Sequence, residues 1–194
     1  MKKVLFILFL FAFFYCNAQD NIKVSGYGSM TDLPLHSMRG EAIYHWEFSQ
    51  FSKNTTLEIV LWDFKDSLSG VSKMVLFREL LSIKENPRID VMVQNNKEGA
   101  LEICCNYIGK FFSVHPLKSD VKVTPYVIKS LPKTMDKVVP IILFVGDIQK
   151  IDESILWKIT NLKEFDIHNN KSVLEELLSQ SHSFKILTYQ LTEK

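Results

Sequence analysis

Cysteine is scarce in this chain, which has three among 194 residues. An exported domain held together by disulfides has spaced, paired cysteines. Here Cys104 and Cys105 are adjacent, and a disulfide between neighbours needs a strained ring and a distorted peptide bond. We therefore expect the core to stabilise the fold, with a helix placing at least one of these two side chains in the interior as a small apolar group.

The familiar catalytic patterns are also missing. No glycine-rich phosphate loop follows a predicted strand, and Val145-Gly-Asp147 has a single glycine. The five histidines are scattered, without the spacing of metal ligands. No Gly-x-Ser-x-Gly elbow occurs. The sequence thus gives no reason to expect a cofactor or a metal.

No block of like charge stands out, and the whole chain has 23 basic and 22 acidic residues. Without residues 1–18, which hold two lysines and no acid, the net charge becomes −1. A near-neutral, unpatterned surface argues against nucleic acid and against an anionic membrane surface as the main partner. Apolar residues make up 46%, with seven glycines and six prolines, which is typical of a globular chain.

The amino terminus has the layout of a secretory signal peptide. A basic start at residues 1–3 precedes an apolar run at 4–15, and Ala18 is the small residue before the expected cut. The run is shorter than the roughly 20 residues that span a bilayer, so we expect no membrane span after cleavage. We predict export to the periplasm or the outside, with residues 19–194 as one domain. A lipid anchor on Cys16 is the less favoured alternative, because bulky residues precede it.

Alternating strand and helix patterns predict one α/β domain. Its three layers would hold a mixed or mainly parallel sheet flanked by helices, with a β-α-β unit at the C-terminal end. The strand patterns cover residues 22–25, 41–51, 57–64, 89–93, 121–128, 138–145, 164–168 and 184–191. The helical patterns cover 70–84, 97–112, 152–162 and 172–180, with Asp152 as a cap and Ser172 with Glu175 as a capping box.

The stretch 57–74 reads as a buried strand that stops, turns and enters a helix, a junction where binding sites gather in α/β proteins. Asp63-Phe64, four residues and then Ser69-Gly-Val-Ser72-Lys-Met resemble the active-site segment of thioredoxins. In that family an Asp-Phe pair precedes Cys-Gly-Pro-Cys-Lys-Met, so Ser69 and Ser72 stand where the cysteines would be. Val-Thr-Pro125 is similar to the family's cis-proline loop, with Pro140 as a rival for that position. The resemblance covers residues 57–162 and implies a thioredoxin-like fold, to which residues 164–191 would add the extra C-terminal β-α-β unit.

The resemblance implies a site that cannot exchange disulfides, because a serine hydroxyl supplies no thiolate. What remains is a helix N-terminus with free N–H groups beside a proline loop, which can hold an extended peptide or an anion. The binding residues implied are Asp63, Asp66, Ser69, Ser72, Thr124 and Pro125. The plainer interpretation is that Ser69 only caps the helix and Asp63 only binds N–H groups of the turn.

The leading functional hypothesis is an exported, redox-inactive thioredoxin-like module that binds another envelope protein or an extended peptide. One alternative is a small exported hydrolase, whose candidate residues are Asp63, Asp66, Ser69 and His115. Another is a structural subunit that uses the aromatic row around Trp46 as an interaction surface. That row has the period of two expected of a half-buried strand, so it is also typical of a sheet's core face.

Overall fold

The computed structural model consists mainly of antiparallel β-structure. It describes residues 23–27, 42–49, 54–81, 88–95, 101–107, 110–117, 123–127, 135–146, 151–162 and 164–193. Sheet A has the strand order β1 (Lys23–Tyr27), β2 (Ala42–Ser49), β5 (Arg88–Asn95), β6 (Leu101–Tyr107), β7 (Lys110–Leu117). Sheet B has the order β4 (Ser67–Leu80), β3 (Thr55–Lys65), β10 (Ser183–Glu193), β9 (Val138–Gly146), β8 (Val123–Val127). The described residues contain two helices, α3 (Glu153–Thr160) and α4 (Lys171–Ser181).

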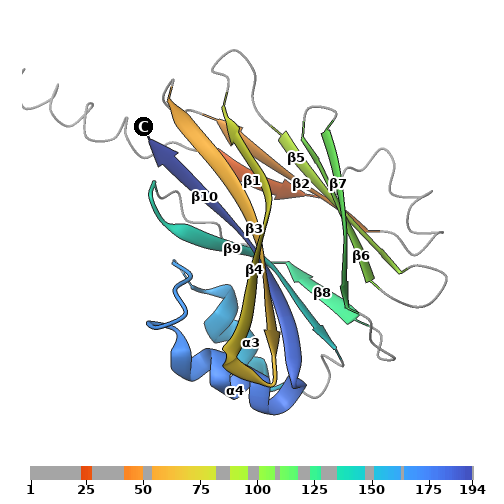
Figure 1. Ribbon diagram of the computed structural model, residues 1–194, viewed down its shortest axis with the longest axis vertical. Coiled ribbons are helices and arrows are strands. Elements are labelled where there is room, and N and C mark those ends of the chain that lie inside the picture. Colours follow the sequence, from red (N-terminus) through yellow and green to blue (C-terminus); the bar gives the residue numbers. More distant parts are fainter. Residues whose placement is uncertain are drawn as a thin grey trace, which may run out of the picture.

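The elements form three layers, sheet A, sheet B and the helix pair. One apolar cluster joins side chains of β2, β5 and β6 to side chains of β3, β4, β9 and β10, so the two sheets pack face to face. A second cluster joins the other face of sheet B to α3 and α4. Figure 1 shows the two helices together at one end of sheet B, next to the β3–β4 turn. The helices therefore cover only part of that face.

The central strands of sheet B have apolar side chains on both faces, as their near-continuous apolar sequences predict. In β10, Phe184 and Ile186 face the helices, whereas Leu187 and Tyr189 face sheet A. Every residue from 139 to 145 of β9 is buried. In β2, Trp46 is buried in the core between the sheets, together with Phe48, which agrees with the core interpretation of the aromatic row.

The predicted α/β class is wrong, because every strand pair described is antiparallel. The main cause is the expected helix at 70–84, which is strand β4. Opposite the neighbours Ile59 and Val60 stand Phe77 and Val75, so Leu76 is an extra, bulged residue. The bulge puts Met74 and Phe77 on the same face of β4. Their spacing of three imitates a helix.

A second expected helix, at 97–112, is also wrong. Its apparent stripe runs through two strands, β6 and β7, that pair with each other. Within β6 the buried Ile103 and Cys105 alternate with partly exposed neighbours, as in a strand. Cys105 is buried and Cys104 is partly exposed, and both are free thiols. Burial raises the pKa of Cys105 to about 12 and also raises that of Cys104, so both resist ionisation.

Several of the other predicted elements agree with the structure, and two do not. The strands expected at 57–64, 89–93, 138–145 and 184–191 correspond to β3, β5, β9 and β10. Asp152 caps α3 as expected, since its carboxylate accepts a hydrogen bond from the Ser154 N–H at 2.7 Å. The expected capping box fails because α4 begins after Asn170. Residues 164–168 form a turn region and no strand, so the expected β-α-β extension is absent there.

Candidate functional site

Because the predicted fold class is wrong, the thioredoxin-like layout is wrong as well. Two of its predicted site residues nevertheless lie next to each other. Asp63 of β3 and Ser72 of β4 stand opposite each other in the antiparallel ladder. Ser72 lies within a strand and not at a helix N-terminus. The remaining features of the expected site, a strand-to-helix turn and a facing proline loop, are not formed by these residues.

Pro125 lies in the same cross-strand row but far from Asp63. The row runs from Asp63 to Lys185, then to Phe144, and then to Pro125 on the edge strand β8. Three strand spacings separate Asp63 from Pro125, or about 14 Å. No described residue forms a cis peptide bond, so Pro125 is not a cis-proline. Thr124 is its neighbour on β8, opposite Val145.

Asp66 forms the turn between β3 and β4, and Ser69 lies near the start of β4. Asp66 has a positive φ of 56° and its N–H donates to the His182 carbonyl at 2.9 Å, which ties the turn to the end of α4. The Ser69 hydroxyl is exposed and hydrogen-bonded to the Ser67 hydroxyl at 2.8 Å. His115 lies on β7 of sheet A, whereas Ser69 lies on sheet B.

Asp63 is the centre of an ion cluster on the face of sheet B that is turned toward sheet A. Its Oδ2 pairs with Lys185 of β10 and, at 3.7 Å, with Lys65. The Lys185 side chain is only 3% exposed, while Lys65 is largely in solvent. Burial lowers the pKa of Lys185, and the bond to Asp63 partly opposes that shift. The second carboxylate oxygen, Oδ1, is buried and accepts no hydrogen bond from any described residue. The pair is enclosed and structural in character.

The opposite face of sheet B, beyond the helices, forms a groove of about 570 Å³. Strands β3, β4 and β10 make its floor. Its lining residues are Thr56, Glu58, Lys73, Arg78, Glu79, Leu80, Gln190 and Thr192. Its volume falls in the range of small-ligand sites, roughly 300–1,000 Å³. Unlike such sites, it is open and its lining is more polar than apolar.

Glu58 organises the charges of this groove. Its carboxylate pairs with the Arg78 guanidinium through Oε2 and with Lys73 Nζ through Oε1 at 3.8 Å. The Glu58 side chain is 12% exposed, whereas Lys73 and Arg78 are 47% and 63% exposed. The acid thus lies beneath two cations. We call Glu58, Lys73 and Arg78 the outer charge cluster.

Trp62 connects the outer charge cluster to the helix-covered part of sheet B. The Lys73 ammonium lies 5.2 Å from the centroid of the Trp62 ring, within cation–π range. The indole N–H donates to the Thr188 hydroxyl at 3.0 Å, and the ring packs edge-on against Phe165 at 5.3 Å. Lys73 is therefore held from two sides, by a carboxylate and by an aromatic face.

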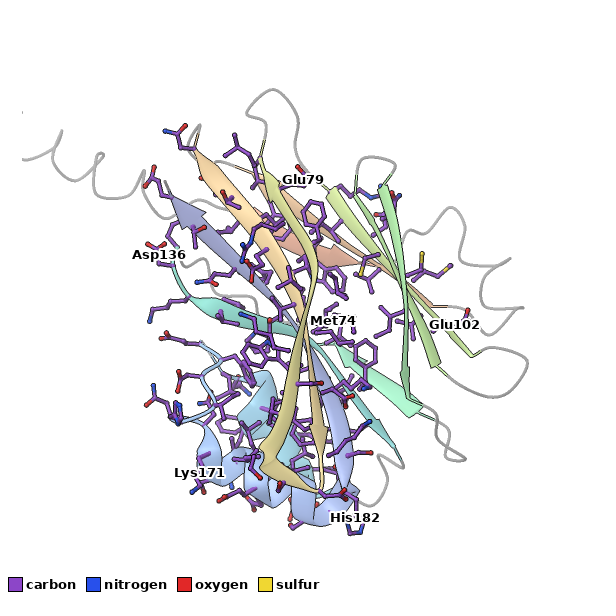
Figure 2. The ribbon with its side chains drawn as sticks, in the orientation of Figure 1. Met74, Glu79, Glu102, Asp136, Lys171 and His182 are labelled. Atoms are coloured by element: carbon purple, nitrogen blue, oxygen red, sulfur yellow. The ribbon has the colours of Figure 1, made fainter. Side chains whose placement is uncertain are left out.

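β4 forms an edge of sheet B along 14 residues. Three large apolar side chains on it, Met74, Val75 and Leu80, are between 45% and 56% exposed. Figure 1 shows β4 crossing the front of the molecule, and Figure 2 shows Met74 midway along it and Glu79 near its end. Natural edge strands are usually short or protected by charges and bulges. β4 has a bulge, yet it remains long and partly apolar.

The outer charge cluster and Lys185 were not predicted from the sequence. One signal was available, because Glu58 and Lys185 each interrupt an apolar strand pattern. A charged residue in a buried strand requires an opposite charge on a neighbouring strand. Finding that partner needs the register, and the mistaken helix at 70–84 removed Lys73 and Arg78 from consideration.

Comparisons with known proteins do not assign a function to this site. No protein-family model matches the chain, and neither a curated protein nor a solved structure matches it. Among the described residues no group of histidine, cysteine or acidic side chains is arranged to hold a metal. Neither described helix has the length and apolar character that a membrane crossing requires. The predicted signal peptide at residues 1–18 lies outside the described part of the chain.

Proposed function

We propose that this protein is an exported binding module that holds another protein of the cell envelope through the outer edge of β4, where no other described strand pairs with it. The observation that carries the proposal is the exposure of three large apolar side chains on a 14-residue edge strand, Val75 and Leu80 on the groove face and Met74 on the face toward sheet A. The secretion signal predicted for residues 1–18 supports the location. The binding role expected from the sequence is retained, but it belongs to a sheet edge and not to a strand–helix junction.

An edge strand binds by adding a strand from its partner. The partner's backbone hydrogen-bonds to N–H and C=O groups along the edge, and its alternate side chains meet those of the edge strand. Each of the three apolar side chains is already about half buried, so covering it stabilises the complex by about 1 kcal/mol. Together they supply about 3 kcal/mol, roughly a hundredfold in affinity.

The small exported hydrolase has less support. Asp63 pairs with Lys185, and the Ser69 hydroxyl bonds to Ser67. A Ser–His pair needs hydrogen-bond reach, and His115 belongs to the other sheet. No specific observation favours that activity over binding.

Site-specific photocrosslinking in the exporting cells tests the binding role. A photoreactive amino acid replaces Met74 or Leu80 in two variants, and it replaces Trp157 in a matched control. Trp157 is a suitable control because it is also an exposed apolar side chain, 67% exposed, but lies on α3. We expect one discrete crosslinked protein from the β4 positions and none from position 157. The same pattern from all three positions would refute the proposal.

A further inference from the structure

The exposed charge beside the β4 edge is positive. The outer charge cluster has two cations and one acid, and the acid lies beneath the cations. Glu79 also borders the groove, but it stands opposite Leu57, whose side chain is in the core between the sheets. Opposed residues of an antiparallel pair share a face, so Glu79 projects from the other face of β4 than Arg78. A strand arriving at this edge therefore meets cations on the groove side.

The register also gives the order of side chains on that side. Lys73, Val75, Arg78 and Leu80 stand opposite Trp62, Val60, Glu58 and Thr56. From one end to the other the groove face of β4 thus presents a cation, an apolar group, a second cation and a second apolar group. A complementary strand carries acidic side chains beside apolar ones on a single face.

Both cations keep hydrogen-bonding capacity for a second carboxylate. Arg78 uses Nε and one terminal nitrogen on Glu58, and a guanidinium has five N–H donors in all. Lys73 approaches one oxygen of Glu58 and the face of Trp62. Glu58 and Trp62 hold the cations in place before any ligand arrives, which lowers the entropic cost of binding.

We propose that the partner bound at the β4 edge is an extended, apolar peptide segment whose groove-facing side chains include a carboxylate paired with Arg78 or Lys73. This inference rests on the proposed function and names the chemistry of its ligand. A basic segment would be repelled by the two cations. A second copy of this chain would bring its own Lys73 and Arg78 to the same edge, which disfavours self-pairing.

Selection from a random peptide library on the purified mature chain tests the inference. The library displays peptides of about ten residues, a typical upper length for a strand. A variant with Met74→Lys, Val75→Lys and Leu80→Lys serves for counter-selection, since these exposed changes block the edge without touching the core. We expect peptides that bind the wild type alone, rich in β-branched or aromatic residues and containing Asp or Glu.

Fluorescence anisotropy on a selected peptide then measures how much the peptide carboxylate contributes to binding affinity. Replacing its acid by the matching amide, or introducing Arg78→Gln or Lys73→Gln, is expected to weaken binding about fivefold, the scale of a partly exposed ion pair. Lys158→Gln is the matched control, because Lys158 is a half-exposed lysine paired with Glu176 at 3.0 Å on the helices. Its affinity should equal that of the wild type.

The results of these experiments distinguish a failure of the carboxylate inference from a failure of the proposed function. Peptides that need the β4 edge but bind equally well as acid and amide would overturn the carboxylate inference and leave the proposed function standing. Peptides that bind the edge-blocked variant as well as the wild type, or no enrichment at all, would overturn both. A concentration-dependent dimer that the edge-blocked variant cannot form would assign the edge to a second copy and overturn the inference.

Discussion

Strand β3 carries two acids, Glu58 and Asp63, on opposite faces of sheet B, and each is shared by two cations. On the groove face the acid is covered and both cations reach solvent. On the face toward sheet A one cation, Lys185, is itself buried. Similar chemistry therefore has two uses. The exposed cations are available to a ligand and add little stability. The buried cation, Lys185, makes the stability of the fold depend on its counter-charge, Asp63.

The largest effect is expected from Asp63→Asn. It leaves the buried Lys185 ammonium without a counter-charge, and breaking a buried pair costs about 3 kcal/mol. The free energy of unfolding from urea titration measures the loss. Glu58→Gln is the matched change on the other face and should cost under about 1 kcal/mol, because Arg78 and Lys73 stay solvated. Equal losses would erase the distinction between the two faces.

The double variant Asp63→Asn with Lys185→Met sharpens the same contrast. Removing both charges leaves no buried ion, and the methionine keeps most of the apolar stem of the lysine. We expect the double variant to recover about 2 kcal/mol relative to Asp63→Asn alone. Urea titration of the two single variants and the double variant gives the coupling. Additive losses would show that Asp63 and Lys185 contribute independently.

The pH dependence of stability reports on Lys185 directly. Its pKa is lowered in the folded state, chiefly by burial, from an ordinary value of 10.5. Between the two pKa values the unfolded chain binds more protons, so the free energy of unfolding rises with pH in that window. Below the folded-state pKa the cost of the buried charge is fully present. Relative to Lys185→Met, the wild type should therefore gain stability as pH rises toward 10.5. A constant difference would contradict this.

Salt should produce the smallest effect. Raising the ionic strength from about 0.1 M to 1 M shortens the Debye length from about 10 Å to 3 Å, which screens exposed charges and spares buried ones. The stability difference between wild type and Glu58→Gln should shrink toward zero, while that of Asp63→Asn should persist. Thermal unfolding at both salt concentrations measures the two differences. Equal sensitivity to salt would place both acids in the same environment.

The sequence predicted those strands whose pattern arises within the strand itself. The apolar runs of β3, β9 and β10 and the alternation in β5 identify them without reference to neighbours, and Asp152 identifies the start of α3. β4 was not predictable this way, because one bulged residue, Leu76, changes its period. The mistake propagated, because a helix between strands implies a crossover and hence a parallel sheet.

The candidate site was predicted only where it depended on local order. Asp63 and Ser72 were expected to be close, and they are opposed across one ladder. Lys185 is as close to Asp63, but it follows more than a hundred residues later along the chain. Nothing in the spacing of residues indicates such a pairing. The outer charge cluster likewise depends on register, which a sequence without a known strand pairing does not contain.

The position of β10 in sheet B determines when the protein can fold. This strand lies between β3 and β9, and its Thr188 bonds to Val60 across a separation of 128 residues. During synthesis β3 lacks its inner neighbour, β10, until nearly all the described chain has been made. Such long-range closure makes folding slow. If the protein is exported as we propose, that delay keeps the chain open while it is threaded through the secretion channel, and the sheet closes on the far side.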